Sequence, residues 1–376
     1  PAVRVKLGED PYDPGGYFII NGSERVIVGV EDLAPNRIIL EEKKIGPYSF
    51  YIARVFSTTV GYRTRVEVRL KGQNNELKVY LPGVGQEVPF VIMLKALGME
   101  SDKEIAERVS PFPEIQELLA PSFDAAQNIL NKEDAIMYIG NRVAYGQSDK
   151  VRLNKTQNVL DKILLPHVGL DENCRYAKAL FLCEMAERVL AMKLGWRPPD
   201  DKDHYRNKRI RLAGGLLAEL FRTAFRRMIR DFKYQLEKSS LRHRVVHSFS
   251  NLITTSLITD SINQAMATGN WGKRLVGVTQ LLDRTNYLSV LSHLRRVQSP
   301  LSRSQSNFDA RDLHPTHRGQ LDPNETPEEV NCGLVKNMSI GAQISVSAEK
   351  STVEKILLKF GLITVDKAGP DERLSA

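Results

Sequence analysis

Apolar and polar residues alternate through much of positions 15–82, which is the pattern of half-buried β-strands. Residues 15–30 contain two short strands, GYFII and ERVIVGV, joined at Asn21-Gly22, a dipeptide that favours a tight hairpin turn. Residues 48–70 alternate with period two and predict a strand pair. A polar turn at 72–75 then leads into another strand, LKVYLP. The first part of the chain is therefore predicted to be mainly β.

The spacing of the apolar residues becomes helical after Pro89. Ser101 and Glu104 form a capping-box pattern that opens the helix DKEIAERV. Residues 124–145 and 173–194 also have a helical period, and the second segment ends at Gly195, shortly before two prolines. Strands followed by helices, without βαβ alternation, predict an α+β fold.

Residues 210–236 have the strongest amphipathic pattern of the chain. Arg222, Arg226, Arg230 and Lys233 fall on its polar face. We therefore expect one face to be buried in a core and the other to present a row of cations. The apolar face consists of Leu212, Leu216, Leu217, Leu220, Phe221, Ala224, Phe225, Met228, Ile229 and Phe232.

Two further helices are predicted, at 248–267 and at 351–360. The first ends at the breaker sequence 268–270, and the second ends at Gly361. The second helix looks like the start of a domain that the chain does not complete. The opening residues, PAVRVKLGED, have no initiator Met and no apolar signal segment, so we expect them to be the cut edge of a longer chain.

Length and composition indicate an ordinary soluble protein of two or three compact units, with 376 residues, 42% hydrophobic and 26% charged. No apolar run approaches the roughly eighteen residues that a membrane span needs. The three cysteines are too few and too scattered for a disulfide framework. Cys174 and Cys183, with His167 nearby, match no zinc spacing, so they are predicted to be buried free thiols in a reducing cytoplasm.

The net charge of +8 is unevenly distributed. Residues 202–247 contain 13 Lys and Arg against 4 Asp and Glu, and residues 271–318 contain 8 against 3. The rest of the chain is therefore acidic on balance. Positive charge concentrated in two segments is typical of a protein that binds a polyanion, although a solvated helix face is the alternative for the first segment.

The chain shows no complete catalytic motif. His243 and His247 have the i, i+4 spacing of a zinc-protease helix, but Arg244 stands where the general-base Glu belongs. Gly214-Gly215 lacks the Lys-Ser/Thr of a phosphate-binding loop, and no D-x-D-x-D cluster is present to hold paired magnesium ions. We therefore predict no metal site and no catalytic residue in this chain.

Five blocks of sequence together carry a resemblance to a known family. They are GGYFIINGSERVIV (Gly15–Val28), DHYRNKRIRLAGGLLAELF (Asp203–Phe221), LSHLRR (Leu291–Arg296), ARDLHPTH (Ala310–His317) and ETPE followed by CGLVKN (Glu325–Asn337). In this order they resemble the second-largest subunit of multisubunit DNA-directed RNA polymerase, in its archaeal and eukaryotic form. The resemblance implies a first part of the protrusion, with its β hairpin, at 1–37, the lobe at 38–209, the helical return of the protrusion at 210–270, a mainly helical fork at 271–345 and the start of the external domain at 346–376.

The resemblance also implies a function. The assembled enzyme is a nucleotidyltransferase, and this chain would form one side of the DNA cleft and support the RNA–DNA hybrid and the downstream DNA. Its partners would be the largest subunit, which carries the catalytic Asp triad, the other polymerase subunits, the DNA template and transcription factors on the lobe and protrusion, with no membrane. Mg²⁺ would be bound in the assembled enzyme, and no cofactor by this chain. The location would be cytoplasmic and nucleoid-associated, or nuclear in a eukaryote.

The candidate nucleic-acid contacts lie in the fork. Arginine suits phosphate because its planar guanidinium binds two oxygens, and polar side chains can reach sugar hydroxyls. By resemblance, the hybrid-facing floor of the channel runs from Gln280 to Arg296, one fork loop covers 270–278, and a second, Ser-rich loop covers 297–310. The predicted contacts are Lys273, Arg274, Gln280, Asp283, Arg284, Asn286, His293, Arg295, Arg296 and Arg303. The alternative for this group is an internal network, such as an ion pair between Asp283 and Arg295.

Arg311 and Glu328 match residues close to the active centre of the family, with an ion pair between them as the alternative. Three positions depart from the family pattern. Arg318 replaces an aromatic residue, Asp322-Pro323 replaces Cys-Pro, and Glu329 replaces a glycine, which puts a side chain where we expect the backbone to need a positive φ. The rival function is a free-standing, non-catalytic nucleic-acid-binding module, which should lack large uncovered apolar patches. A metallohydrolase built on His243 and His247 is a third alternative.

Overall fold

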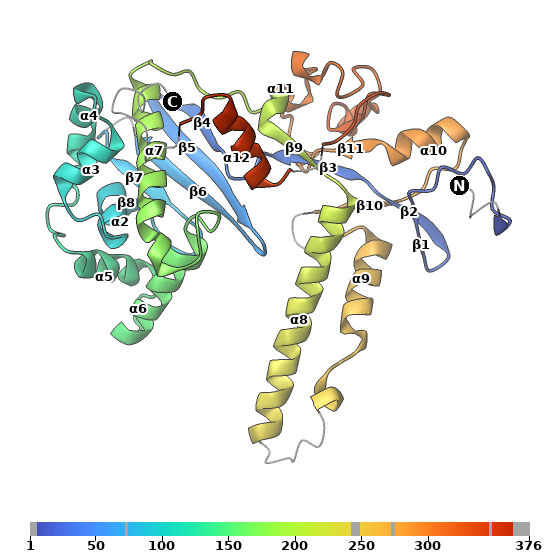
Figure 1. Ribbon diagram of the computed structural model, residues 1–376, viewed down its shortest axis with the longest axis horizontal. Coiled ribbons are helices and arrows are strands. Elements are labelled where there is room, and N and C mark those ends of the chain that lie inside the picture. Colours follow the sequence, from blue (N-terminus) through green and yellow to red (C-terminus); the bar gives the residue numbers. More distant parts are fainter. Residues whose placement is uncertain (1–5, 72–73, 242–248, 272–274, 346–347, 364–376) are drawn as a thin grey trace.

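A computed structural model describes residues 6–71, 74–241, 249–271, 275–345 and 348–363 (Figure 1). Residues 38–89 form a five-stranded antiparallel sheet in which the strands follow one another in chain order. Its strands are β4 (Ile38–Ile45), β5 (Tyr48–Thr59), β6 (Tyr62–Lys71), β7 (Leu77–Tyr80) and β8 (Val88–Pro89). Val55, Val66 and Val68 are fully buried, as the period-two pattern predicted.

Helices cover the sheet and complete a large core. The longest, α7, crosses one face of the sheet (Figure 1), and its Leu182, Met185 and Val189 are fully buried there. Ser101 caps α3 through its hydroxyl, but Glu104 does not complete the predicted capping box and instead accepts the hydroxyl of Tyr176 at 2.9 Å. Helix α7 stops just before Gly195, which adopts a left-handed conformation as expected. The helices are α2 (Phe90–Ala96), α3 (Asp102–Val109), α4 (Pro113–Asp124), α5 (Lys132–Val143), α6 (Asp149–Asn158), the short π-helix Val159–Ile163, the 3₁₀ turn Glu172–Cys174 and α7 (Arg175–Lys193).

The other sheets are assembled from segments far apart in the sequence. One sheet has the strand order β1-β2-β10 and the other β12-β11-β3-β9. Pairing of β11 with β3 is parallel, and the other strand pairs that the structure describes are antiparallel. The strands are β1 (Phe18–Ile20), β2 (Ser23–Ile27), β3 (Gly29–Leu33), β9 (Lys208–Arg211), β10 (Thr279–Leu281), β11 (Arg296–Gln298) and β12 (Val335–Asn337).

The segment predicted to be the lobe lies between β3 and β9 in the chain. Leu33 lies opposite Lys208 in the β3–β9 pair, and the amide of Ala34 donates to the carbonyl of Asn207 at 2.8 Å. The chain therefore enters and leaves the lobe at one place. The fork strands β10 and β11 pair with β2 and β3, so the fork and the first part of the protrusion share their sheets. The domain limits themselves stay predictions.

The helix pair α8 (Ala213–Leu241) and α9 (Ser256–Thr268) projects away from these sheets (Figure 1). A small core at its base contains Leu216, Met266, Trp271 and Val278. The 3₁₀ turn Phe249–Leu252 precedes α9, which ends at Gly269 in a left-handed conformation. The remaining elements are α10 (Tyr287–Leu294), α11 (Phe308–Arg311), α12 (Lys350–Lys359) and the 3₁₀ turns Tyr205–Asn207, Pro315–His317 and Glu329–Asn331.

Several predicted boundaries were wrong. The predicted helix 124–145 is the end of α4, an irregular link and α5. Residues 208–211 are strand β9, so α8 starts at Ala213, and the predicted helix 248–267 begins only at Ser256. The predicted loop 297–310 is shorter than expected, because β11 extends to Gln298 and α11 begins at Phe308. All three glycines that were expected to end helices, Gly195, Gly269 and Gly361, do so, because each adopts a positive φ.

The predicted burial of the whole apolar face of α8 is also wrong. Leu216 and Ala224 are buried, but Phe221, Phe225 and Ile229 are 48%, 41% and 48% exposed. The physical reason is the side on which they lie: the segment 254–268 runs along α8 as far as Asp231, which Thr254 contacts at 2.9 Å, but it covers only one side of that helix (Figure 1). Helix α12 is more exposed than α8, since none of its residues is buried. Two apolar helix faces therefore lie uncovered in the part of the chain that the structure describes.

Candidate nucleic-acid interface

The residues from Gln280 to Arg296 form a strand, a helix and a strand. Asn286 caps α10: its Oδ1 accepts the amide of Ser289 at 2.8 Å, and the hydroxyl of Ser289 accepts the amide of Asn286 at 3.1 Å. This capping box was missed in the sequence because Ser289 stands where Glu or Gln is usual. The side-chain oxygen of Asn286 therefore already has a partner within the chain.

His293 lies at the centre of this unit and is buried. Its Nδ1 accepts the amide of Asp283 at 3.1 Å, so its Nε2 carries the proton and donates to Oε1 of Gln280 at 3.0 Å. Burial lowers the pKa of His293, and the positive charge of Arg296 lowers it further, so the imidazole is neutral. Gln280 also donates to the carbonyl of Gly277 at 3.0 Å. The geometry favours a structural role for both residues.

Asp283 and Arg284 also make contacts within the chain. Asp283 accepts the amide and the hydroxyl of Thr285 at 3.0 and 2.6 Å, and these bonds lower its pKa. Arg284 donates two bonds to the carboxylate of Glu24, at 2.8 and 2.7 Å, which hold the pKa of Glu24 below its ordinary value. Its guanidinium lies 5.1 Å from the ring centroid of Tyr17. Arg284 thus ties the fork to the first hairpin.

The two adjacent arginines of LSHLRR differ in their surroundings. Nη2 of Arg295 donates to the carbonyls of Met338, Ser339 and Ile340, so the predicted alternative pair with Asp283 is not formed. Arg296 has no ion pair within the described residues, and its buried Nε has no hydrogen-bond partner there. Arg296 is therefore the arginine of this pair with capacity left for a ligand.

The remaining candidates lie in the two fork loops. Arg303 is exposed in the loop after β11, and no ion pair involves its side chain among the described residues. Lys273 and Arg274 lie outside the described residues. Contact of these side chains with nucleic acid stays a prediction.

Arg311 organises the second fork loop from within. Its guanidinium donates to five backbone carbonyls, and no ion pair with Glu328 is formed in the described structure. Those acceptors belong to Arg303, Gln305, Ser306, Val330 and Cys332. Arg311 therefore fixes the loop 303–306 against the segment 330–332. Glu328 is exposed and precedes the 3₁₀ turn at 329–331.

The structure shows the local environment of the three positions that depart from the family pattern. Asp322 stabilises a turn, because its Oδ1 accepts the amides of Asn324 and Glu325 at 2.9 and 3.1 Å. Arg318 is exposed. Glu329 has a φ of +61°, so the expectation that this position needs a positive φ is confirmed.

Replacing Glu329 with glycine should therefore stabilise the protein. A left-handed conformation costs a non-glycine residue roughly 1–2 kcal/mol, and the greater freedom of glycine in the unfolded chain offsets part of that gain. We expect a net gain of about 0.5–1 kcal/mol in the free energy of unfolding, measured by chemical denaturation. Glu328→Gly, at a negative φ, is the control and should destabilise. Equal effects of the two changes would contradict this explanation.

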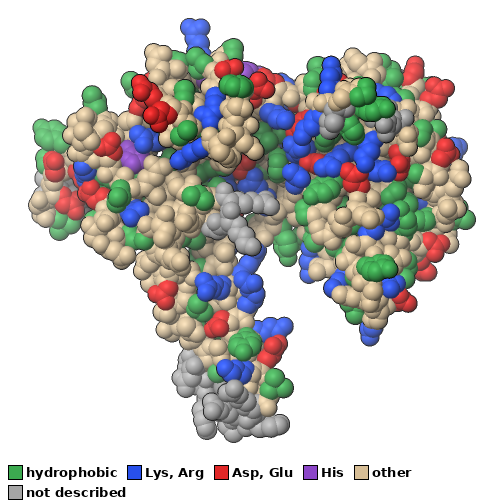
Figure 2. All heavy atoms as spheres, turned by 180° about the vertical axis from the view of Figure 1, so that it is seen from behind, with side chains coloured by type: hydrophobic (Ala, Val, Ile, Leu, Met, Phe, Trp, Pro, Cys, Tyr) green, Lys and Arg blue, Asp and Glu red, His purple; other side chains and the backbone are tan. Residues whose placement is uncertain are grey.

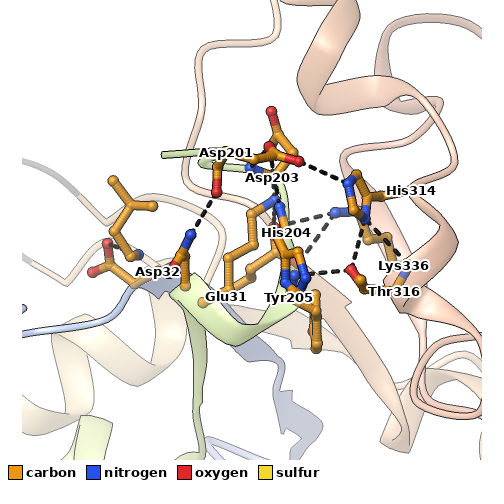
Figure 3. Close-up of polar contacts among 12 residues, drawn as sticks. Glu31, Asp32, Asp201, Asp203, His204, Tyr205, His314, Thr316 and Lys336 are labelled. Atoms are coloured by element: carbon orange, nitrogen blue, oxygen red, sulfur yellow. Dashed lines mark hydrogen bonds and ion pairs between the residues drawn. The ribbon is translucent and has the colours of Figure 1, made fainter. Parts of the chain in front are cut away.

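A buried polar junction was missed by the sequence analysis (Figure 3). Glu31 of β3 is 3% exposed and lies 3.0 Å from Nζ of Lys208 and 3.1 Å from Nζ of Lys336. Lys208 also contacts Asp203 at 3.0 Å. Burial raises the pKa of Glu31, but attraction to the two lysines outweighs it and leaves the pKa below its ordinary value. A signal was present, since Glu31 directly follows the apolar run 26–30.

The same junction connects the end of the lobe to the fork. Nε2 of His314 lies 2.8 Å from Oδ2 of Asp201, and the amide of Tyr205 donates to the hydroxyl of Thr316 at 2.9 Å (Figure 3). Burial lowers the pKa of the neighbouring His317 to about 4. These contacts fix the fork against β3 and β9, which sets the position of Arg296 and of the loop after it.

No metal site emerges from the part of the chain that the structure describes, where three or more His, Cys, Asp or Glu side chains are nowhere grouped to hold an ion. His243 and His247 lie outside that part. Cys183 is buried as predicted, whereas Cys174 is only half-buried. Helices long and apolar enough to cross a bilayer are likewise absent from the described residues.

Comparison with known proteins identifies the family. The family model of RNA polymerase Rpb2, domain 2, matches residues 30–211, and that of RNA polymerase Rpb2, domain 3, matches residues 280–344. The chain is 49% identical, over 96% of its length, to DNA-directed RNA polymerase subunit Rpo2 of Saccharolobus shibatae. It is 46% identical over 91% of its length to subunit Rpo2N of Halobacterium salinarum, and 44% identical over 96% to Rpo2N of Methanothermobacter thermautotrophicus.

The chain belongs to the Rpb2/Rpo2 family of DNA-directed RNA polymerase subunits. It spans 32% of the Saccharolobus relative, 65% of the Halobacterium relative and 73% of the Methanothermobacter relative. The resemblance found in the sequence and the α+β fold class are thereby confirmed.

Proposed function

We propose that this chain is part of a cytoplasmic, nucleoid-associated DNA-dependent RNA polymerase, in which it forms one side of the DNA cleft and supports the RNA–DNA hybrid and the downstream DNA. Its partners are the largest subunit, the other polymerase subunits, the nucleic acids and transcription factors that bind the lobe and protrusion. The carboxylates and the Mg²⁺ of nucleotide addition belong to those partners. The observation that carries the proposal is the match to archaeal Rpo2 and Rpo2N subunits over nearly the whole chain.

The uncovered helix faces favour a polymerase part over a free-standing module. Large exposed apolar patches on a water-soluble protein usually mark an interface. The ring of Phe221 stacks on that of Phe225 at 5.9 Å on the open side of α8, and Phe360 at the end of α12 is 86% exposed. A self-sufficient module would be expected to cover such surfaces.

Within the fork, we assign the contact with the nucleic-acid backbone to Arg296 and Arg303. Both guanidinium groups lack a carboxylate partner among the described residues, whereas Arg284, Arg295 and Arg311 are held by internal contacts. A guanidinium without an internal partner can bind phosphate without first breaking an ion pair. The internally bonded group positions the surface on which Arg296 and Arg303 act.

Arg296→Ala in the assembled polymerase tests this assignment. Loss of a charge-assisted bond to phosphate should cost about 1.5–3 kcal/mol and shorten the lifetime of stalled elongation complexes. The measurement is the dissociation rate of those complexes as the salt concentration is raised. Arg230→Ala, an equal change of charge on an exposed face of α8, is the control and should behave like the parent. An Arg296 variant that dissociates at the parental rate would leave Arg296 with a structural role only.

A further inference from the structure

A cleft of about 400 Å³ lies between the lobe and the first half of α8, away from the fork residues discussed above. On the lobe side it is bounded by the turn between β5 and β6. Lys and Arg side chains gather on the upper part of the α8–α9 hairpin and on the neighbouring lobe (Figure 2). The cleft is lined by five arginines, Arg63, Arg209, Arg211, Arg222 and Arg226, which we call the arginine pocket.

The charges of the arginine pocket are only partly balanced. Its two acidic residues are already paired: Asp32 with Arg63, and Glu219 with Arg211. The other three arginines have no carboxylate partner among the described residues, and Nη1 of Arg209 donates only to backbone carbonyls, at 2.7 and 2.8 Å. Counted over its described lining, the pocket therefore keeps an excess of three positive charges.

Two of these arginines stand on one face of α8. Arg222 and Arg226 are four residues apart, a spacing at which like charges repel and destabilise a helix. The guanidinium of Arg226 lies 5.9 Å from the ring centroid of Tyr62. It also packs on Gly61, which has a φ of +88°, and a Cβ at that position would collide with it. The lobe turn thus holds Arg226 at the mouth of the pocket, close to Arg222.

We propose that the arginine pocket binds two neighbouring phosphate groups. Guanidinium groups bind phosphate oxygens in pairs, and a bound dianion would remove the repulsion between Arg222 and Arg226. The volume lies within the range of small-ligand pockets, about 300–1,000 Å³. Two sources share this chemistry, consecutive phosphates of a nucleic-acid strand and a free diphosphate. The proposal does not depend on the fork assignment, because none of the described fork residues lines the pocket.

The test uses the full chain with two probes, inorganic pyrophosphate and a short single-stranded oligonucleotide, and titration calorimetry as the readout. Arg222→Ala removes an exposed arginine that has no carboxylate partner in the described part of the chain. Gly215→Glu adds a carboxylate inside the pocket, where a new Cβ meets no atom within 4 Å. Glutamate favours helix more than glycine does, so we expect this variant to fold, and its thermal unfolding is measured beside that of the parent. Arg230→Ala, on the same helix outside the pocket lining, is the matched control.

We expect pyrophosphate to bind the parent and the control alike, and each pocket variant about tenfold or more weakly, the effect of losing one charge-assisted bond. Oligonucleotide binding that pyrophosphate displaces, and that the pocket variants weaken, would identify the strand backbone as the source. Pyrophosphate binding through the pocket with no effect on the oligonucleotide would identify a free diphosphate. Unchanged pyrophosphate binding in both variants would overturn the proposal. So would pocket-dependent binding of a polyglutamate peptide that pyrophosphate does not displace, since that would indicate an acidic protein partner.

Discussion

Replacing Glu31 with glutamine should cost about 3–5 kcal/mol of folding free energy, because it leaves two buried lysines without their shared counter-charge. Nζ of Lys208 and Nζ of Lys336 both lie within 3.1 Å of the Glu31 carboxylate. Burial lowers the pKa of Lys336, whereas attraction to Glu31 and Asp203 outweighs burial for Lys208 and raises its pKa. Lys336 is therefore the lysine whose charged form is destabilised most when position 31 carries a neutral side chain. Chemical denaturation of the parent and the variant measures the difference.

The same substitution at an exposed ion pair provides the control. Glu24 is 34% exposed in its pair with Arg284, and exposed pairs contribute about 0–1 kcal/mol. Glu24→Gln should therefore change the stability little. If Glu24→Gln destabilises as much as Glu31→Gln, burial is not what makes Glu31 important.

The cost of Glu31→Gln should also depend on pH. Because the pKa of Glu31 is lowered on folding, its carboxylate stabilises the folded state above its ordinary pKa of 4.5. That contribution is lost as the pH falls from 4.5 through the lower folded pKa. The stabilities of parent and variant should therefore converge in acid, and a difference that stays constant below pH 4.5 would contradict the ionic explanation.

Leu216→Ala should destabilise the protein by about 2–5 kcal/mol, whereas Phe225→Ala should cost far less. Leu216 is fully buried in the small core at the base of α8, and Phe225 is 41% exposed on the open side of the helix. Thermal unfolding of the two variants separates these cases. Equal losses of stability would mean that another part of the chain covers Phe225.

In an assembled polymerase, Phe225→Ala should have an effect that it does not have in the isolated chain. If a partner subunit covers the open side of α8, Phe225→Ala should weaken assembly while leaving the stability of the isolated chain nearly unchanged. Co-purification of the variant with its partners provides that measurement.

The parts of the fold that the sequence predicted well are those determined by local chemistry. Asn21 and Gly22 adopt φ values of +49° and +78° in the turn between β1 and β2, and the long strands β5 and β6 follow their alternation. Strands β10, β11 and β12 were missed. Each has three residues, too few for a period, and β10 pairs with a strand about 250 positions earlier. Such pairings depend on the tertiary fold and leave no local signal.

The candidate site also shows what the sequence alone could not predict. The sequence could propose that the arginines of the fork bind phosphate, but it could not separate those already bonded from those that are free. Arg295 and Arg296 are adjacent and chemically identical, yet strand pairing directs only the first toward the carbonyls of 338–340. The arginine pocket is likewise invisible along the chain, because its walls come from the lobe turn and from α8.

The insertion of the lobe between β3 and β9 has a consequence for the order of events during synthesis. Strands β1 to β3 leave the ribosome long before β9 to β12, which complete their sheets. The lobe contains its own core and, like most domains, can fold while translation continues. Once folded, it holds Leu33 beside Lys208 and removes most of the entropic cost of closing that long loop. A change that slows folding of the lobe should therefore delay the fork as well, although the described residues of the two share no hydrophobic core.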